Sequence, residues 1–321
     1  MRGRRLLVRL AEACLTVFVG LTATFAIVTV APNTAVEGAV ASASFASGGE
    51  LNESELAALR ETYRAARGLD RPLSARYVGY MLHMVTLQWG VSFSLDAPVT
   101  ALVADRMART LRYAIPGFLL AVVFGVTGGL YSTAREGTLR AAAIRVGGYL
   151  AFGIPNFWIA GVLLWVLALP PVAAALGPAW WLTRWAFPAL LLATTLFASQ
   201  LAYTRSETRE VVGADFVRYL HAKGLSGRTV ALRVLRNVVG PIAALFVTDL
   251  LAVLVVAIYV IEFAFGIPGF GRLSYDAAIE RDMPLLLGTA VVVIVIGVLG
   301  NLLSDVIASA ADPRTREGGE S

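Results

Sequence analysis

Long runs of apolar residues alternate along the chain with shorter segments that carry arginine. Six of these runs are close to the roughly 20 residues that an α-helix needs to cross a hydrocarbon core of about 30 Å. The pattern therefore predicts an all-α polytopic membrane protein with six transmembrane helices. The predicted spans are residues 10–31, 113–133, 146–169, 186–203, 240–262 and 284–308.

The composition supports a membrane protein. Of the 321 residues, 57% are hydrophobic and only 15% are charged, whereas soluble domains carry about 25% charged residues. The formal net charge of +5 does not indicate a nucleic-acid partner, because the arginines gather beside the apolar runs. Arginine-rich segments precede the first span, separate the second from the third and the fourth from the fifth, and follow the sixth. They predict a multi-pass protein of the cell membrane with both termini in the cytoplasm.

The predicted spans divide the chain into four parts. Residues 1–31 hold the N-terminal tail and first span, 32–112 form a large extracytoplasmic segment, 113–308 form the membrane core with a charged loop at 204–239, and 309–321 form a cytoplasmic tail.

The extracytoplasmic segment contains two predicted helical pieces. The stretch "NESELAALRETYRAARG" predicts a helix that Asn52 or Ser54 caps and that ends before Gly68. The stretch "RYVGYMLHMVTLQWGVSF" is apolar but short and aromatic, which favours an interfacial or re-entrant piece. Its Met81, His83 and Met84 favour an amphipathic helix over a nickel site, since a metal site needs more converging ligands.

The loop between the fourth and fifth spans is the most charged part of the core. Ten charged residues lie between Arg205 and Arg236, and their burial in the bilayer would cost more than about 25 kcal/mol. Within the loop, Val217 and Leu220 share a helix face, Gly224 can end that helix, and Ser226 can cap a second one. The pattern predicts a cytoplasmic knob of two short helices. The residues alone leave open whether this knob binds a partner.

The sequence offers little for catalysis or metal binding. Cys14 is the only cysteine, His83 and His221 are the only histidines, and no H-E-x-x-H motif occurs. Lys223 is the only lysine and glycine follows it, so the chain has no P-loop. The sequence therefore disfavours a membrane-embedded enzyme and predicts that any ATP is used by another protein.

Two stretches resemble a known family. The loop sequence "EVVGADFVRYLHAKGLS" (Glu210–Ser226) resembles the coupling-loop motif of ABC importer permeases of the dipeptide, oligopeptide and nickel family. The sequence "EFAFGIPGFGRLSYDAAIERDMP" (Glu262–Pro284) is similar to the outer signature loop of the B-type subunit of that family. Weaker matches are "GLDRPLSARY", "WGVSF", "PNFW" and "DPR". The chain departs from the family at "YLH", where Thr-Ala-Arg is usual, and at "APNT", where Gly-Asp-Pro is common.

The resemblance implies a non-catalytic transport subunit with several partners. These are a second permease subunit, two ABC ATPase subunits that use ATP and Mg²⁺, an extracytoplasmic substrate-binding protein and membrane lipid, with no cofactor bound by this chain. It implies peptides as substrates, with nickel or another small solute as the alternative. The residues that it assigns to ATPase coupling are Glu210, Gly213, Asp215, Phe216, Arg218, Ala222, Lys223, Gly224 and Leu225.

Two further sets of residues are candidates for function. The resemblance implies that the outer loop faces the binding protein through Pro268, Gly269, Gly271, Arg281 and Asp282. Asp249, inside the fifth span, is a candidate for the substrate pathway or for a pair with a polar group of the second permease. A stand-alone secondary transporter is the rival class. It predicts inverted repeats and several mid-membrane carboxylates, and the sequence has no evident repeat and only Asp249 well inside a span.

Overall fold

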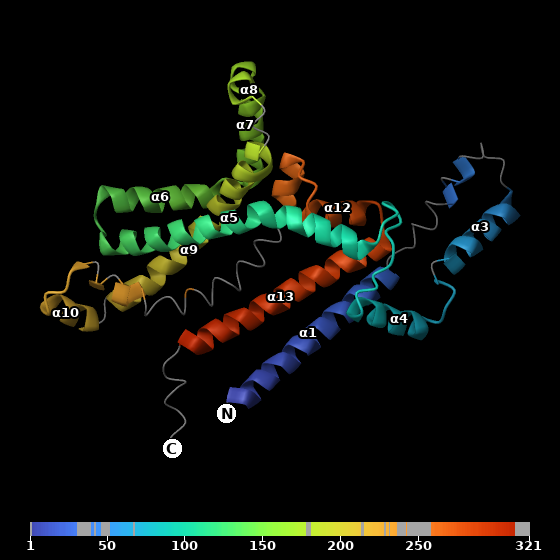
Figure 1. The fold of residues 1–321 in the computed structure, drawn as a ribbon, viewed down its shortest axis with the longest axis horizontal. Coiled ribbons are helices and arrows are strands. Elements are labelled where there is room, and N and C mark those ends of the chain that lie inside the picture. The colour runs from blue at the N-terminus through green and yellow to red at the C-terminus, as the bar shows by residue number, and fades with distance from the viewer. Residues whose placement is uncertain are drawn as a thin grey trace. The chain divides into compact units, whose positions relative to one another are not determined.

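The computed structural model is helical throughout the regular elements that it describes (Figure 1). It describes residues 2–30, 40–41, 43–45, 52–66, 68–177, 181–212, 215–227, 229–230, 232–235, 242 and 258–311. These residues belong to two compact units, one of residues 1–106 with 273–295 and one of residues 107–272 with 296–321.

The first unit is built on two long helices, α1 (Arg2–Val30) and the first part of α13 (Met283–Ala311). The two helices meet closely, because a Cβ at Gly20 would lie 3.1 Å from the Cδ1 atom of Ile294. Helix α4 (Leu73–Val85) packs against α1 through aromatic rings, with centroids 5.3 Å apart for Phe25 and Tyr80. This unit also contains α3 (Glu53–Ala66) and the beginning of α5 (Val99–Ala134).

The two helical pieces predicted in the extracytoplasmic segment are present. Asn52 Oδ1 accepts a hydrogen bond from the Glu55 amide at 2.9 Å, and Glu55 Oε2 accepts one from the Asn52 amide at 2.9 Å. This reciprocal capping box confirms the predicted start of α3. Gly68 follows the helix with φ +62°, as expected of a C-terminal glycine. The 13 residues of α4 are too few to cross a membrane, in line with the predicted short piece.

The second unit packs helices around the remainder of α5. Its further elements are α6 (Leu139–Gly153), α7 (Asn156–Ala168), α8 (Pro170–Leu176), a π-helical turn (Leu182–Ala186), α9 (Phe187–Val212), α10 (Asp215–Ala222), the first three residues of α12 (Phe270–Ile279) and the last part of α13. A hydrophobic core joins α5, α9 and residues near 261, with Tyr113, Leu192 and Ile261 fully buried. Glycines allow α5 and α9 to approach, since a Cβ at Gly129 would lie 2.5 Å from Cβ of Thr204.

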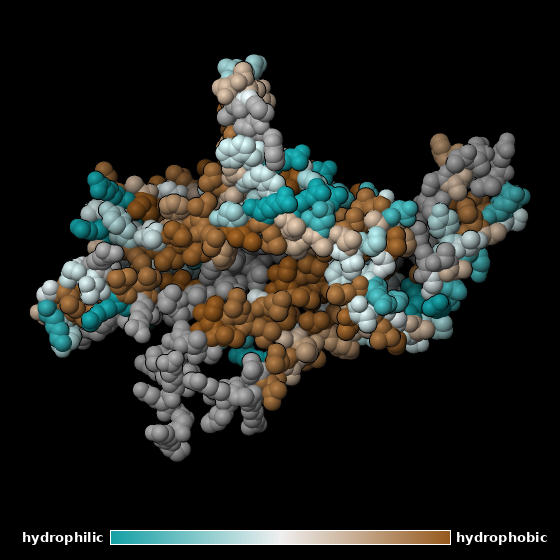
Figure 2. Space-filling model, in the orientation of Figure 1, coloured by the Kyte–Doolittle hydropathy of each residue, from teal (hydrophilic) through white to brown (hydrophobic). Residues whose placement is uncertain are grey.

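Four of the predicted spans are confirmed by helices that are long and apolar enough to cross a membrane. Within the described residues these are Leu7–Val30, Val99–Ala134, Leu182–Val211 and Met283–Ile307. Figure 2 shows hydrophobic residues over the long helices, as expected of surfaces that face lipid. Helix α5 begins at Val99 rather than near residue 113, so it carries the second span and also a polar extension before it.

The third predicted span, residues 146–169, is not one straight helix. Helices α6 and α7 meet at a bend of 92°. The physical reason is Pro155, which lacks an amide hydrogen and forces Ile154 into an extended conformation with φ −93° and ψ 119°. If the bent pair counts as one span, the described residues contain five. Most of the fifth predicted span, 240–262, lies outside the described residues, so the count of six stays a prediction.

Candidate coupling surface and outer loop

The charged loop after α9 forms the predicted knob, which comprises α10 and the helical residues between 227 and 235. Val217 and Leu220 on α10 are 3% and 4% exposed and form a small apolar core with Val230 and Val234. Neighbouring side chains that pack against this core are Leu130 of α5, Val211 of α9 and Leu225. The knob is therefore fixed to the ends of two long helices by apolar contacts.

The turn inside the knob has the predicted chemistry. Gly224 adopts φ +70° at the end of α10, a conformation that glycine adopts without steric cost. The hydroxyl of Ser226 accepts a hydrogen bond from the Thr229 amide at 3.4 Å, and the Ser226 carbonyl accepts one from the Val230 amide at 3.0 Å. Both the glycine stop and the serine cap are confirmed.

The other face of α10 is exposed. Arg218, Tyr219, Ala222 and Lys223 reach the surface there, and Lys223 Nζ lies 4.4 Å from the centroid of the Tyr219 ring. This face combines positive charge with an aromatic ring, which suits contact with a protein partner. Of the other residues assigned to coupling, Glu210 is exposed at the end of α9, whereas Gly213 and the side chains of Asp215 and Phe216 lie outside what the structure describes.

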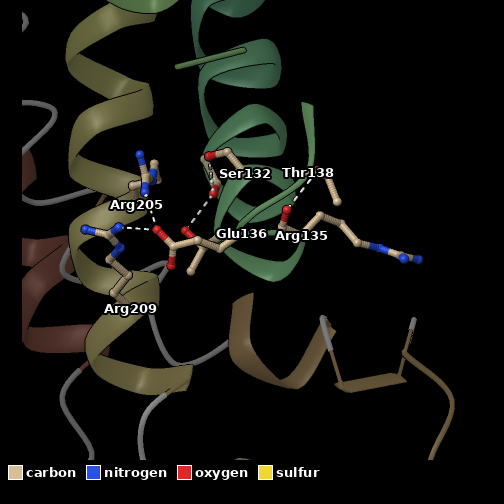
Figure 3. Close-up of polar contacts among 8 residues, drawn as sticks. Ser132, Arg135, Glu136, Thr138, Arg205 and Arg209 are labelled. Carbon is tan, nitrogen blue, oxygen red and sulfur yellow. Dashed lines mark hydrogen bonds and ion pairs between the residues drawn. The ribbon is translucent and has the colours of Figure 1, made fainter. Parts of the chain in front are cut away.

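A cluster of charged residues joins α9 to the turn between α5 and α6 (Figure 3). Glu136 Oε1 accepts hydrogen bonds from Arg205 Nη2 at 3.0 Å and from Arg209 Nη2. The hydrogen bond from Arg209 is the main cause that lowers the pKa of Glu136 below its usual value. The sequence pattern predicts only a role in membrane topology for these arginines and assigns no role to Glu136. An acidic residue within a short basic loop was the available signal.

The outer loop is organised around a buried carboxylate, Glu262. Its Oε1 accepts hydrogen bonds from Thr110 Oγ1 at 2.5 Å and from the Tyr113 hydroxyl at 3.0 Å. Its Oε2 accepts one from the Arg272 amide at 2.9 Å. The Phe270 amide in turn donates to Thr110 Oγ1 at 2.8 Å. Glu262 therefore holds the first turn of α12, whose amides have no partner within the helix, against α5.

Two glycines of the outer loop permit this arrangement. A Cβ at Gly269 would overlap the Glu262 carboxylate, and a Cβ at Gly271 would lie 2.9 Å from Ile258 Cγ2. Both glycines are buried, and Pro268 between the loop and α12 is half-buried. Their positions explain why the loop needs glycine, and their predicted role in facing a binding protein stays a prediction.

In the first unit, Asp282 caps the start of α13. Its Oδ2 accepts hydrogen bonds from Ser92 Oγ at 2.5 Å and from the Ser94 amide at 2.9 Å, while Oδ1 accepts one from the Leu285 amide at 3.2 Å. The side chain is buried, at 1% exposure. Arg281 beside it is exposed with φ +55°. Asp282 therefore holds the loop at Ser92 and Ser94 against the start of α13. Its contact with a binding protein stays a prediction.

The knob and the outer loop both lie within a stretch that matches a known sequence family. The family described as "Binding-protein-dependent transport system inner membrane component" matches residues 110–317. The chain belongs to this family. It is an ABC importer permease of the peptide and nickel group and a multi-pass membrane protein.

Two relatives align with most of the sequence of this permease. The metal-staphylopine import system permease protein CntB of Staphylococcus aureus is 26% identical over 255 residues, which are 78% of this chain and 80% of CntB. The oligopeptide transport system permease protein AppB of Bacillus subtilis is 28% identical over 267 residues, which are 79% of this chain and 84% of AppB. The two relatives differ in the substrates that their names give.

The remaining candidate of the permease is Asp249. It lies outside the described residues, so its surroundings carry no argument and its role stays a prediction. Among the residues that the structure does describe, no group of three or more His, Cys, Asp or Glu side chains could hold a metal ion.

Proposed function

We propose that this permease forms one half of the transmembrane pathway of an ATP-driven peptide importer, with its termini and knob in the cytoplasm. The other half is a second permease subunit, two ABC ATPase subunits bind the knobs, and an extracytoplasmic binding protein delivers the substrate to the outer loop. The observation that carries the proposal is the attachment of α10 to α5 and α9 through a buried apolar core.

This attachment gives a mechanical reason for the coupling role. Packed apolar side chains transmit a displacement with little compression. A movement that an ATPase imposes on the exposed face of α10 would therefore reach the ends of α5 and α9 at Leu130 and Val211. Rigid-body motion of such helices is one way in which a transporter alternates between its two open states.

Peptides are the proposed substrate, and a metal complex is the alternative. AppB, an oligopeptide permease by name, supports the first, while CntB, a metal-staphylopine permease by name, supports the second. Asp249 in the fifth predicted span would suit a cationic group on either substrate.

Co-purification from native membranes tests the ATPase contact. We expect a tagged parent chain to retain an ABC ATPase. The amount of ATPase that co-purifies with the double variant Arg218→Glu with Lys223→Glu should be lower by about tenfold or more. Both residues lie on the exposed face of α10, and like or reversed charge at an interface is strongly unfavourable. Arg140→Glu, on the exposed start of α6, is the matched control and should behave as the parent does.

Two outcomes would contradict the proposal. A parent chain recovered alone from membranes that contain the ATPases would favour a stand-alone transporter. Equal ATPase recovery with the parent and the double variant would remove the assigned face of α10 from the contact. The ligand of the co-purified binding protein then decides the substrate, because a peptide and a metal complex are distinguished by mass.

A further inference from the structure

A cavity of about 790 Å³ lies in the first unit, among α1, α3, α4 and the first turn of α13. Its volume falls in the range of about 300–1,000 Å³ that is usual for small-molecule sites. Phe25, Val28 and Leu287 supply apolar wall from the end of α1 and the beginning of α13. Both helices are long and apolar enough to span a membrane, and in the predicted topology the cavity would lie where these spans meet the outer membrane surface.

The charged residues that line this cavity are basic. Arg64, Arg71, Arg76 and His83 line it, and none of the described residues that line it is an aspartate or a glutamate. The three arginines form no ion pair with another described residue. The cavity therefore offers several cationic donors to a ligand and no carboxylate that would compensate them.

A buried hydroxyl group points to the same kind of ligand. Tyr80 lines the cavity at 8% exposure, and within the described residues its hydroxyl has no hydrogen-bond partner. Burial raises the pKa of Tyr80 to about 12, so the hydroxyl keeps its proton and can donate. A buried hydroxyl without a partner is costly, and because its oxygen is enclosed in this structure, an anionic oxygen in the cavity would accept its hydrogen bond after a shift of the neighbouring side chains.

An apolar groove adjoins the cavity. The groove measures about 470 Å³, shares Phe25 and Thr29 with the cavity, and continues along α1 and α4. Its other walls are Thr22, Ala26, Val30, Leu73, Ser74 and Tyr77. Only 6% of the apolar window of α1 is buried in this chain, so the groove opens beside a helix surface that suits lipid tails.

We propose that this cavity and groove together bind an anionic phospholipid. The phosphate accepts hydrogen bonds from the Tyr80 hydroxyl and the arginines, and one acyl chain lies in the groove along α1. A small peptide shares the anionic carboxylate but does not need an apolar slot that opens toward the bilayer. The proposal does not rest on peptide transport, because its polar residues Arg64, Arg71, Arg76 and Tyr80 belong neither to the knob nor to the outer loop, although Met283 and Pro284 at the end of the outer loop also line the cavity.

Native mass spectrometry of the purified transport complex tests the site. Mixed micelles that contain either phosphatidylglycerol or phosphatidylcholine are titrated into the complex, and the lipid molecules that stay bound are counted. We expect the parent to prefer phosphatidylglycerol. Because each basic residue near a lipid surface contributes about a fivefold gain in affinity, Arg71→Gln with Arg76→Gln should weaken binding roughly 25-fold. Arg60→Gln, on the exposed surface of α3 and outside the cavity, should leave it unchanged.

A second variant and a competitor keep the test decisive. Tyr80→Phe preserves the ring contact with Phe25 and should weaken phosphatidylglycerol binding several-fold without lowering the thermal midpoint. Equal binding of the two lipids, or unchanged binding in both variants, would overturn the proposal. Displacement of the lipid by millimolar inorganic phosphate or a tripeptide would also overturn it, because the site would then take a small free anion.

Discussion

The knob and the outer loop are both fixed to α5, but by different chemistry. The knob rests on aliphatic side chains, with Val217 and Leu220 at its centre and Leu130 of α5 beside them. The outer loop rests on the carboxylate of Glu262, which side-chain hydroxyls and a backbone amide surround. Loss of one methyl group weakens an apolar core by a limited amount. Loss of one acceptor in a buried network leaves several donors without a partner at once.

This difference fits what each region leaves available. The knob uses its apolar face for attachment, so the arginine, lysine and tyrosine on the opposite face of α10 remain at the surface. The outer loop uses its polar groups internally, and Glu262 is fully buried. The knob can therefore be recognised by a partner through its exposed side chains. In the outer loop, Glu262 instead preserves the shape of the backbone.

The largest effect is expected from Glu262→Ala. The substitution removes the acceptor for Thr110, Tyr113 and the Arg272 amide, and each buried donor without a partner costs about 1–3 kcal/mol. We expect the free energy of unfolding to fall by at least about 3 kcal/mol, measured by denaturant titration of the purified permease in detergent. Glu280→Ala, at the exposed end of the same outer region, should change it by less than about 0.5 kcal/mol. Equal stability of the two variants would mean that the buried network contributes little.

A more local effect is expected from Leu220→Ala. Truncation of a buried leucine costs about 2–5 kcal/mol, and Leu220 lies in the apolar core of the knob. Amide hydrogen exchange should therefore quicken in residues 215–235 and stay unchanged in the outer loop. Leu232→Ala, the same substitution at an exposed position of the knob, is the matched control. Faster exchange throughout the permease would contradict the view that the knob is a separate local core.

The features that sequence predicted best are those that short stretches determine. The cap of α3, for which the sequence offered Asn52 or Ser54 and which Asn52 provides, the left-handed Gly224 and the cap at Ser226 all involve residues within a few positions of each other. Each follows from local backbone chemistry. The spans followed from continuous hydropathy for the same reason. Continuous hydropathy also misled, because the apolar run 146–169 hides the break that Pro155 imposes.

The features that sequence missed are contacts between distant residues. Glu262 and Thr110 are 152 positions apart, and Asp282 and Ser92 are 190 positions apart. No local pattern shows that such acidic residues are buried. The sequence therefore predicted that Asp282 lies at the surface of the outer loop. Glu136 belongs to the same class, since its arginine partners come from α9.

The smallest effect is expected from Glu136→Gln. The ion pairs of Glu136 with Arg205 and Arg209 join the knob end of α9 to the turn between α5 and α6. Because hydrogen bonding to Arg209 lowers its folded-state pKa, the contribution of Glu136 to stability is fully present above its unfolded pKa of about 4.3. The contribution is lost as the pH falls through the lower folded value. At pH 7 in low salt, Glu136→Gln should lower the thermal midpoint slightly. The difference from the parent should shrink in about 1 M salt, where charges on the surface are screened beyond about 3 Å.

The control for this variant is Glu210→Gln, which removes an exposed carboxylate from the C-terminal end of α9, where Arg205 and Arg209 also lie. If Glu136 acts through Arg205 and Arg209, the thermal midpoint of Glu136→Gln should depend less on salt and pH than that of the parent. The thermal midpoint of Glu210→Gln should depend on salt and pH as that of the parent does. If both variants respond alike, the effect is one of net charge, and the attachment of the knob side would be apolar alone. That outcome would sharpen the contrast with the outer loop, because one end of α5 would then be fixed entirely by packing and the other by a buried carboxylate.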